Sequence, residues 1–567
     1  MYNKTKSLEF KNFRKFADFP AIEFNDITFL VGANNSGKST FVKAVMLVYN
    51  YLQQRDLRTV DFNANGVDIL NIVSYERALH KSNAINKPEE IQIGATIHDY
   101  KFDIKLKSHK ENSKATVLDF KCSYWGTTSL QIDPVARTIR IEEAPSRVLA
   151  TFGDEKEDAA REELFKLNDE LASIENPFSI EYIEIKAAID KLSETLEVGK
   201  EIAGWSVEVD YQSDDILEVL TGLTNLIATM PMLHAPESDS ILGKNSDGEE
   251  EEEEEEEDNE LIDDENSFNS IDQTFHYDSD RDNWIVRLKM EQKKITDIQS
   301  LYTARNGVMQ FLTGLKDVVT TSEIVYLPAT LNKQSALFFV RDEKNALAQT
   351  IHNYYQNAHE DDKEVKDFIK YWLVEFKVGD DFRISQIEGE AYTMEISQNG
   401  LWISLADKGM GAIQATLLIL RLASLIRNQK KEEETIAVRD TTDERNYIVV
   451  IEEPELNLHP ALQSKLCDLF FEVNSKYFIE FIIETHSEYM IRRSQVITAQ
   501  QEFSSDMEAV NPNPFTALYF PSEENAQAYT MNYQPDGTFE NSFGSGFFDA
   551  SSSSTLELIK LKRQKNK

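Results

Sequence analysis

A ten-residue segment, VGANNSGKST at Val31–Thr40, constrains the fold of this chain more than any other feature. It satisfies the pattern G-x-x-x-x-G-K-[ST]. The apolar run DITFLV at Asp26–Val31 leads into it, and a helical pattern over Ser39–Tyr51 follows it. In a strand–loop–helix unit of this kind, backbone N–H groups and the helix N-terminus hold phosphate. The sequence therefore predicts an α/β fold in which a buried parallel strand ends at a nucleotide-phosphate site.

Each residue type in this loop has a part in holding a triphosphate. Glycines at positions 32 and 37 permit the backbone conformations that turn successive N–H groups inward. Lys38 reaches the β- and γ-phosphates, and the Ser39 hydroxyl is a magnesium ligand. We therefore predict that ATP and Mg²⁺ bind here, with nucleotide contacts from Gly32, Asn34, Asn35, Ser36, Gly37, Lys38, Ser39 and Thr40.

A second segment, NYIVVIEEPELNLHP at Asn446–Pro460, indicates the acidic half of a hydrolytic site. Its residues 447–451 predict a buried strand, and two carboxylates follow directly. Hydrolysis needs one carboxylate to orient magnesium through water and a second to polarise the attacking water. We predict Glu452 as the metal residue and Glu453 as the catalytic base. The alternative is a strand end that carries acidic surface residues.

Two further segments are candidates for phosphate contacts. In FIIETHS (Phe481–Ser487) another apolar strand leads to His486, which can touch a γ-phosphate and report its presence. In LADKGMGAIQ (Leu405–Gln414) Gly409 and Gly411 open an apolar helix, and a helix N-terminus attracts phosphate. Because the chain already has one phosphate loop, this segment is a candidate to complete the site of a second protomer. The alternative is an ordinary glycine-containing helix start.

Composition excludes several classes of protein. The chain has 567 residues, of which 41% are hydrophobic, and its 32 Phe and 21 Tyr support a large core, so a wholly disordered chain is excluded. No run of about 18 apolar residues occurs, so no transmembrane helix is expected. The first residues lack the apolar stretch of a secretory signal. The two cysteines lie far apart, so neither a disulfide scaffold nor a zinc site is expected, and a reducing cytoplasm fits.

The formal net charge of −40 argues against a general polyanion binder, but this charge is clustered. Residues 235–270 hold 17 acidic side chains against one lysine, including nine consecutive glutamates. Such a segment cannot bury enough apolar surface to offset its ordering entropy, so we expect it to be disordered. It is either a solvated spacer or a segment that regulates or mimics nucleic acid. A local basic groove elsewhere stays compatible with the sequence.

The middle of the chain differs in character from both ends. Residues 60–145 contain strand-like runs such as Ile91–Ile97 and Lys101–Leu106, which predict a β-rich lobe. Leucines and isoleucines within 164–196 then recur at helical spacing on either side of Asn176-Pro177, which predicts two helices and a turn. Each arm spans roughly 20 Å, so a long coiled coil is excluded. The alternative is an ordinary two-helix piece of a globular lobe.

The order of these segments resembles the ABC-type ATPase heads of the SMC/RecF group. LEFKNFRKF at Leu8–Phe16, leading into the phosphate loop, is similar to that group as well. The forms EEPELNLHP and DKGMGAIQ, with a later piece ending in GSGFFD (Gly544–Asp549), look closest to OLD-like ATPases. Those occur in bacterial anti-phage systems, including Septu, PARIS and retron-associated modules. The resemblance covers roughly residues 1–145 and 320–550.

The resemblance implies a role for each segment. Gly32–Thr40 would be Walker A, Glu452 would take the Walker B place and Glu453 that of the catalytic base, with Leu456–His459 as D-loop and His486 as switch histidine. Gly409, Gly411 and Gln414 would belong to the signature segment, which binds the nucleotide of the opposite protomer. Two departures matter, because the Walker B acid is Glu rather than Asp and the signature lacks the usual Ser-Gly-Gly. Gln92 is a weak candidate for the Q-loop glutamine.

The implied fold is an α/β P-loop NTPase head of ABC type, with a β-rich lobe and an inserted helical lobe containing a short coiled coil. The expected domains are the first half of the head at 1–150, a helical hairpin insertion at 151–234, a disordered acidic linker at 235–270, the second half of the head at 271–500, a small β-rich extension at 501–550 and a flexible tail at 551–567.

The implied function is a Mg²⁺-dependent ATPase. Two heads would close over two ATP molecules as a homodimer or higher oligomer, and the switch would control a partner nuclease or effector in anti-phage defence. After His486 we find no D-x-D motif of Toprim type and no H-N-H constellation, so we expect any nuclease on a separate chain. The alternatives are a RecF-like repair ATPase that binds DNA ends or gaps, and a non-hydrolysing nucleotide-dependent scaffold. Nucleic acid is a candidate partner, and a membrane is not expected.

Overall fold

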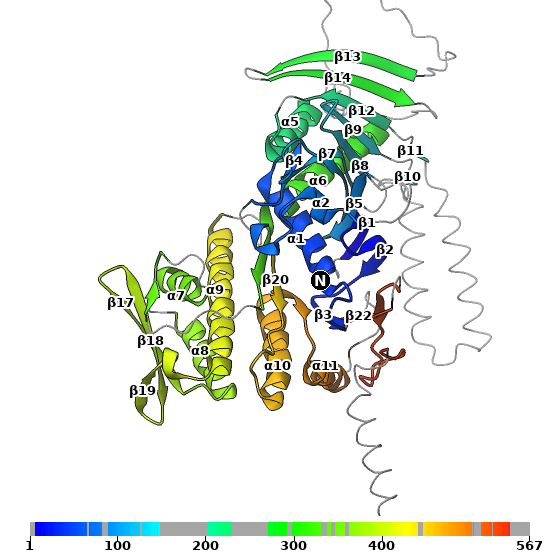
Figure 1. The fold of residues 1–567 in the computed structure, drawn as a ribbon. Coiled ribbons are helices and arrows are strands. Elements are labelled where there is room, and N and C mark those ends of the chain that lie inside the picture. Colours follow the sequence, from blue (N-terminus) through cyan, green and yellow to red (C-terminus); the bar gives the residue numbers. More distant parts are fainter. Residues whose placement is uncertain are drawn as a thin grey trace, which may run out of the picture. The chain divides into compact units, whose positions relative to one another are not determined.

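The computed structural model describes residues 6–64, 67–81, 89–124, 128–143, 146–147, 201–202, 205–211, 213–229, 270–279, 282–291, 298–329, 337–341, 346–357, 362–439, 446–501, 503, 512–523 and 526–544. The chain divides into two compact units, of which the first comprises Met1–Phe120, Asp214–Leu217 and Leu315–Lys567 and the second Lys121–Ser213 and Glu218–Gly314 (Figure 1). The predicted helices within 164–196, the acidic run over 235–269 and the tail at 551–567 lie outside the described residues.

A six-stranded sheet in the first unit carries the phosphate loop. Its order is β15 (Ser322–Leu327), β20 (Asn446–Glu452), β21 (Glu480–Glu484), β3 (Ile27–Gly32), β22 (Phe515–Phe520) and β23 (Tyr529–Met531). The first five strands are parallel, and β23 pairs antiparallel with β22. Every residue of β3 and β22 is buried, as expected for parallel strands covered on both faces. The predicted parallel strand is confirmed, and the domain boundary expected at residue 501 falls inside this sheet.

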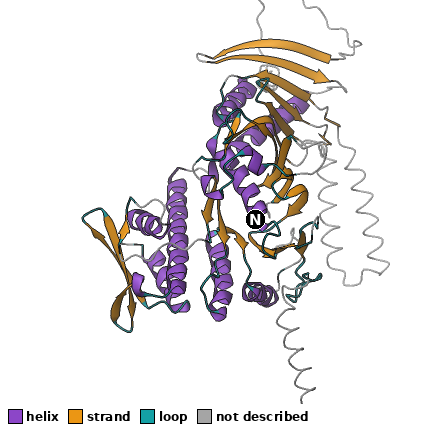
Figure 2. Ribbon diagram, in the orientation of Figure 1, coloured by secondary structure: helices purple, strands orange, loops and turns teal. Residues whose placement is uncertain are grey.

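Helices cover both faces of the sheet (Figure 2). Phe29 and Val31 of β3 join a core with residues of α9 (Met410–Arg439), α10 (Pro460–Tyr477) and α11 (Glu488–Gln501). The alternate residues of the strands point to the opposite face, where α1 (Lys38–Gln54) contacts β3, β15 and β21. On that face Phe41 of α1 packs edge-on against Phe520 of β22. The strand–loop–helix unit expected from the sequence is therefore held from both sides.

Helix α9 is the one helix in the described part of the chain that is long and apolar enough to cross a membrane. Its segment Met410–Lys430 has a mean hydropathy of 1.4, and 61% of that window is buried inside the protein. Ile419, Leu422 and Ile426 are fully buried in the same core as β3. A core helix of a soluble protein meets this length and composition test equally, and burial against the sheet accounts for its apolar residues.

The first unit has two further sheets. β1 (Ser7–Phe13) pairs antiparallel with β2 (Phe16–Glu23) and β5 (Glu90–Ile97), and β5 pairs with β6 (Tyr100–Ser108). β4 (Thr59–Asp61) pairs with β7 (Lys114–Tyr124), which runs on into the second unit. A small sheet of β16 (Phe338–Phe339), β17 (Asp381–Ile387), β18 (Ala391–Gln398) and β19 (Leu401–Ser404) accompanies α7 (Ala346–Asn357) and α8 (Lys363–Glu375), which pack on α9. Short helical turns lie at Asp68–Leu70, Tyr75–Ala78 (α2) and Leu405–Asp407.

The second unit contains an antiparallel ladder. β8 (Thr128–Asp133) pairs with β9 (Thr138–Glu143), and β12 (Trp205–Asp210) lies between β9 and β14 (Asp282–Glu291), which pairs with β13 (Ser270–Ser279). β10 (Ser146–Arg147) and β11 (Glu201–Ile202) form a separate pair. The boundary between the two units falls inside helices α5 (Ile216–Thr229) and α6 (Ile298–Thr321). Strands of this lobe thus come from both sides of the acidic run.

Gly32 ends β3 with a φ of +146°, a conformation that residues with a Cβ rarely adopt. A Cβ added at this position would meet the backbone carbonyl oxygen of Phe520 at 2.2 Å. Because Phe520 is the last residue of β22, the loop can leave the sheet along this path only if the residue has no side chain. The first glycine of the motif is therefore required by strand packing as well as by phosphate binding.

We expect Gly32→Ala to destabilise the first unit through backbone strain of about 1–3 kcal/mol. The melting temperature would fall by about 2–4 °C for each kcal/mol. Gly409→Ala is the matched control, because nothing lies within 4 Å of a Cβ added there. Thermal unfolding followed by circular dichroism checks both variants, and equal melting temperatures would contradict the packing argument.

Candidate functional site

The phosphate loop holds its lysine in a folded-back position. Lys38 Nζ donates hydrogen bonds to the carbonyl oxygens of Gly32 (3.1 Å) and Ala33 (2.9 Å), and it lies 3.7 Å from the Glu484 carboxylate. The Lys38 side chain is only 2% exposed. Burial lowers its pKa, while Glu484 and Glu453 act in the opposite sense. The amine is therefore aligned at the loop and has only carbonyl groups and one carboxylate as partners among the residues described.

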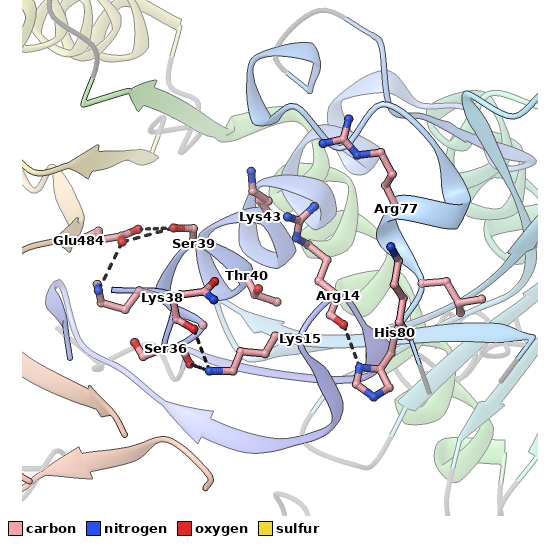
Figure 3. A pocket seen from close by; sticks show the side chains of 14 residues that line it. Arg14, Lys15, Ser36, Lys38, Ser39, Thr40, Lys43, Arg77, His80 and Glu484 are labelled. Atoms are coloured by element: carbon pink, nitrogen blue, oxygen red, sulfur yellow. Dashed lines mark hydrogen bonds and ion pairs between the residues drawn. The ribbon is translucent and has the colours of Figure 1, made fainter. Parts of the chain in front are cut away.

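The rest of the loop is shaped for an anion. Asn35 adopts a left-handed φ of 61°, and Gly37, with φ of 118°, caps the N-terminus of α1. Lys15 Nζ donates to the carbonyl oxygens of Asn35 and Ser36 at 2.9 Å each (Figure 3). These bonds draw two loop carbonyl groups toward Lys15, and the Thr40 N–H donates to the Gly37 carbonyl oxygen at 2.9 Å. Ser36 Oγ is buried and has no hydrogen-bond partner within the described structure.

A cavity of about 630 Å³ opens beside the loop. Its lining residues are Arg14, Lys15, Asn35, Ser36, Gly37, Lys38, Ser39, Thr40, Lys43, Arg77, Leu79, His80, Lys81 and Glu484. Six of these side chains are lysine or arginine, and Glu484 is the single acidic one among the described lining residues. In a chain with a net charge of −40, such a concentration of positive charge indicates a site for a polyanion.

The cations on one side of this cavity repel one another. Figure 3 shows Arg14, Lys43 and Arg77 on the side away from Glu484. Burial lowers the pKa of Arg14, and the nearby Arg77 charge lowers it further. Burial also lowers the pKa of Lys43, with a further contribution from Arg14. Lys43 donates to the carbonyl oxygen of Leu70 and Arg14 accepts from His80 Nδ1 through its own carbonyl, so backbone contacts position the group.

The predicted acidic residues lie at the carboxyl ends of two adjacent strands. Glu452 ends β20 and pairs in register with Glu484, which ends β21. Glu484 in turn pairs with Leu30 of β3, so its strand lies between β20 and the phosphate loop. Burial, with hydrogen bonding to the Glu452 carboxylate, raises the pKa of Tyr326 on β15. Glu452 therefore has a partner on the side away from the loop.

Glu453 has a strained backbone. Its φ is +46°, in the left-handed region that a glutamate rarely adopts. Its N–H donates to the carbonyl oxygen of Glu484 at 2.7 Å, and its own carbonyl accepts from Leu456 N at 3.1 Å. The Glu453 charge raises the pKa values of Lys38 and His486, against the effect of their burial. The structure thus brings the predicted base toward the phosphate loop and the switch histidine, and it maintains backbone strain there.

A buried carboxyl group connects the acidic segment to the histidine segment. Glu455 is 8% exposed, and one of its oxygens accepts a hydrogen bond from the His486 N–H at 2.6 Å. Burial raises the pKa of Glu455. Ser487 Oγ donates to Gln463 of α10 at 2.7 Å, so the segment after β21 is fixed at two points. The position of His486 therefore depends on the EEPE segment directly.

The signature candidates lie elsewhere in the same chain. Gly409 is exposed and has no atom within 4 Å of a built Cβ, whereas Gly411 lies in the first turn of α9 against the carbonyl oxygen of Asn457. Neither lines the cavity, nor do Asn34, Glu452, Glu453, His486 and Gln92. Gln92 lies within β5. Of the predicted nucleotide contacts, Asn35 to Thr40 line the cavity; Gly32 and Asn34 flank them in the loop.

Sequence reasoning missed two parts of this site. The segment FIIETHS contains Glu484, but the sequence analysis predicted no role for this residue, because only the histidine matched a known pattern. The cations Arg14, Lys43 and the pair Arg77 and Lys81 come from three separate segments, and no sequence pattern joins these segments. For Arg14, the KNFRKF segment ahead of the loop was a signal, but only the fold shows that it reaches the cavity.

Magnesium fits this site in the manner of a nucleotide-bound ion. In the described residues no group of three or more His, Cys, Asp or Glu side chains could hold a metal by itself. Mg²⁺ is usually held by one or two protein oxygens together with substrate phosphates and water. The Ser39 hydroxyl, with the Glu484 carboxylate 3.0 Å away, supplies oxygen donors of the required kind.

We expect inorganic tripolyphosphate to stabilise the protein in EDTA, because its charge offsets the repulsion among the cavity cations. At a hundredfold excess over its dissociation constant the gain would be about 2.7 kcal/mol. Arg77→Ala should reduce the rise in melting temperature, whereas Lys476→Ala, at a 60% exposed lysine of α10, should leave it unchanged. An equal rise in both variants, measured by differential scanning fluorimetry, would contradict this reading of the cavity.

We expect His486 to be neutral at pH 7 in the folded protein, and we expect its protonation to reduce the stability of the fold at acidic pH. Burial, with the Lys38 charge, lowers its pKa below the ordinary 6.5, so the unfolded chain binds the proton more readily. Its contribution to stability is therefore fully present above pH 6.5 and is lost as the pH falls toward the folded-state pKa. The melting temperature of His486→Gln should fall less steeply than that of the wild type below pH 6.5. Parallel curves would show that His486 does not titrate in this way.

Three solved structures align with this chain over most of its length. The Smc head domain with an extended coiled coil bound to the C-terminal domain of ScpA, from Pyrococcus furiosus, aligns over 98% of this chain and 99% of its own, with 10% identity and a TM-score of 0.33. The SmcHead bound to the C-winged helix domain of ScpA aligns over 93% and 98%, with 10% identity and a TM-score of 0.32. The SMC head domain from Thermotoga maritima aligns over 94% and 99%, with 9% identity and a TM-score of 0.29.

The sequence itself matches a family model. No curated protein gives a significant sequence match. The model described as AAA ATPase domain, AAA_15, matches residues 4–491, a range that includes the phosphate loop, the acidic segment and His486. Because this match covers most of the chain, the protein belongs to the AAA ATPase domain family.

Proposed function

We propose that this ATPase is a nucleotide-driven switch that controls a partner nuclease or effector in anti-phage defence. Nucleotide binding is supported by the cavity at the phosphate loop, where the described lining residues include six cationic side chains and a single carboxylate. A triphosphate supplies the negative charge that this arrangement lacks. The exposed start of α9 supports the switching part, and the resemblance of the EEPELNLHP and DKGMGAIQ segments to OLD-like ATPases supports the defence role.

Binding would begin at the loop. The amides at the start of α1 and the unpartnered Ser36 hydroxyl would bind phosphate oxygens, and Lys38 would exchange its carbonyl partners for the β- and γ-phosphates. Thr40 lines the same cavity on the α-phosphate side. The cations of the far side, Arg14 and Arg77 among them, would neutralise the remaining charge.

Hydrolysis would use the acids at the ends of β20 and β21. Glu453 would accept a proton from the attacking water, and its backbone bond to Glu484 would hold it beside the loop. Ser39 and Glu452 are the expected holders of Mg²⁺, which when bound supplies positive charge against the developing charge on the phosphoryl group. His486, whose pKa is lowered by desolvation and by the Lys38 charge, would donate a hydrogen bond to the γ-phosphate, while Glu455 fixes its backbone.

Dimerisation would complete the site. Gly409 at the start of α9 is exposed and lies outside the cavity of its own chain, as expected for a segment that binds the nucleotide of a second copy. The γ-phosphate would contact both protomers only before hydrolysis, so its loss would favour the open state. A difference of a few kcal/mol in affinity between the two states is enough to change their populations.

A second candidate function is a RecF-like repair ATPase that binds DNA ends or gaps. This function would use the same nucleotide site and the same dimer. A basic surface that binds nucleic acid would fit both functions, so it does not distinguish between them. A third candidate, a non-hydrolysing scaffold, is disfavoured by the juxtaposition of Glu453, Lys38 and His486. Co-purification from the native host, with and without ATP, separates the first two, because a nuclease bound in an ATP-dependent manner supports the defence switch.

We expect wild-type protein to hydrolyse ATP and Lys38→Ala to lose nucleotide binding. Glu453→Gln should bind ATP but turn it over at least about 100-fold more slowly, because the general base is lost. It should therefore accumulate as an ATP-dependent dimer in size-exclusion chromatography with light scattering. Turnover by the wild type no faster than by Lys38→Ala would support the scaffold. A Glu453→Gln dimer that forms equally without ATP would refute nucleotide-driven association.

A further inference from the structure

The Walker A serine already has a carboxylate partner, and that partner is not Glu452. Ser39 Oγ donates to the Glu484 carboxylate, with oxygen–oxygen distances of 3.0 and 3.3 Å to its two oxygens (Figure 3). The Glu484 side chain is 9% exposed and also lies 3.7 Å from Lys38 Nζ. Two residues of the phosphate loop thus converge on one buried acid from a neighbouring strand.

A hydroxyl group that binds a cation must direct its lone pairs to the metal. Because the hydroxyl has one proton, an acceptor on the opposite side fixes its orientation and increases the basicity of the oxygen. Glu484 is such an acceptor for Ser39, and it is placed by the backbone, since β21 pairs with β3 up to Glu484 and Leu30. The adjacent Thr485 N–H donates to the Leu30 carbonyl at 3.1 Å, which fixes the strand end.

Glu452 is less well placed for this task. Its strand, β20, is separated from β3 by β21, and its register partner on that side is Glu484 itself. On its other side it accepts from Tyr326. The additional methylene that distinguishes Glu452 from the Asp expected at a Walker B position does not bring it next to Ser39, because Glu484 occupies that place.

We infer that Glu484 is the positioning residue for the metal of this site: it accepts the hydrogen bond of the Ser39 hydroxyl and orients the serine oxygen toward Mg²⁺, whereas the sequence pattern places Glu452 as the only carboxylate on the metal, through water. The inference rests on the proposed function, because it assumes that the phosphate loop binds a magnesium nucleotide. Glu484 also lies within ion-pair distance of Lys38, so a bound γ-phosphate would compete with this carboxylate for the lysine while the serine contact stays.

The test separates metal-dependent from metal-independent nucleotide binding. The affinity of the full chain for a fluorescent, non-hydrolysable ATP analogue is measured in EDTA and in Mg²⁺, and Mn²⁺ binding to the protein–analogue complex is followed by electron paramagnetic resonance. For Glu484→Gln we expect affinity in EDTA equal to or tighter than wild type, because Lys38 is released from its ion pair. Mn²⁺ affinity should fall by about 10–100-fold. Glu452→Gln leaves the Ser39–Glu484 contact in place and should therefore lose less Mn²⁺ affinity than Glu484→Gln.

Three variants make the outcome decisive. Glu488→Gln removes the same charge from the 37% exposed first turn of α11 and should behave as wild type. Glu484→Asp keeps the charge but moves the carboxylate away from Ser39, so it should lose part of the Mn²⁺ affinity. If Glu484→Gln does not fold, Glu484→Asp tests the inference in its place. In Ser39→Ala/Glu484→Gln the loss of Mn²⁺ affinity should not exceed that of Ser39→Ala alone, because both changes remove one interaction.

Normal Mn²⁺ affinity in Glu484→Gln, with loss in Glu452→Gln, would overturn this inference and leave the proposed function intact. Additive losses in the double variant would overturn it as well. If wild-type protein binds no analogue in either buffer, the proposed function fails and the role of Glu484 falls with it.

Discussion

The parallel pairing of β20, β21 and β3 is the constraint on which the chemistry of this protein depends. Three strands end at one edge of a sheet, and each end carries a group of the site: the phosphate loop after β3, Glu484 and His486 at the end of β21, and Glu452 and Glu453 at the end of β20. Adjacent parallel strands are held in fixed register. Groups that lie more than 400 residues apart in the sequence, such as the phosphate loop and Glu484, therefore become neighbours without any local sequence signal. Helices on both faces keep this edge rigid.

The charges that line the cavity favour an anionic ligand. The chain is strongly acidic, yet the cavity concentrates cations whose mutual repulsion, together with burial, lowers the pKa values of Arg14 and Lys43. Backbone contacts hold them in place, so the fold sustains the repulsion until an anion arrives. The buried Lys38 and the left-handed Glu453 are further examples of strain or desolvation maintained at the site. A protein selected for stability alone would avoid such features, which is why they indicate function.

The acidic groups of the site have different contacts. Glu484 contacts the loop, Glu453 acts on Lys38 and His486 through space, and Glu455 holds the backbone of His486. Burial and like charge raise the pKa values of Glu484 and Glu455. The Lys38 charge opposes this rise at Glu484, and hydrogen bonds, chiefly the one from the His486 N–H, oppose it at Glu455. The same acidic segment reaches the start of α9, where the Asn457 carbonyl oxygen lies against Gly411.

The sequence alone determined the strand–loop–helix unit, the strands before the paired acids and before His486, and the α/β class, because each follows from periodicity and from residue types within about 15 consecutive positions. It also supplied the candidates from Asn35 to Thr40 that line the cavity. It did not reveal Glu484 or the cations at Arg14, Lys43 and Arg77, nor that β22, more than 480 residues from β3, closes the same sheet. Those depend on strand order and on side chains that converge from separate segments, and proximity of that kind arises only when the chain packs around one core.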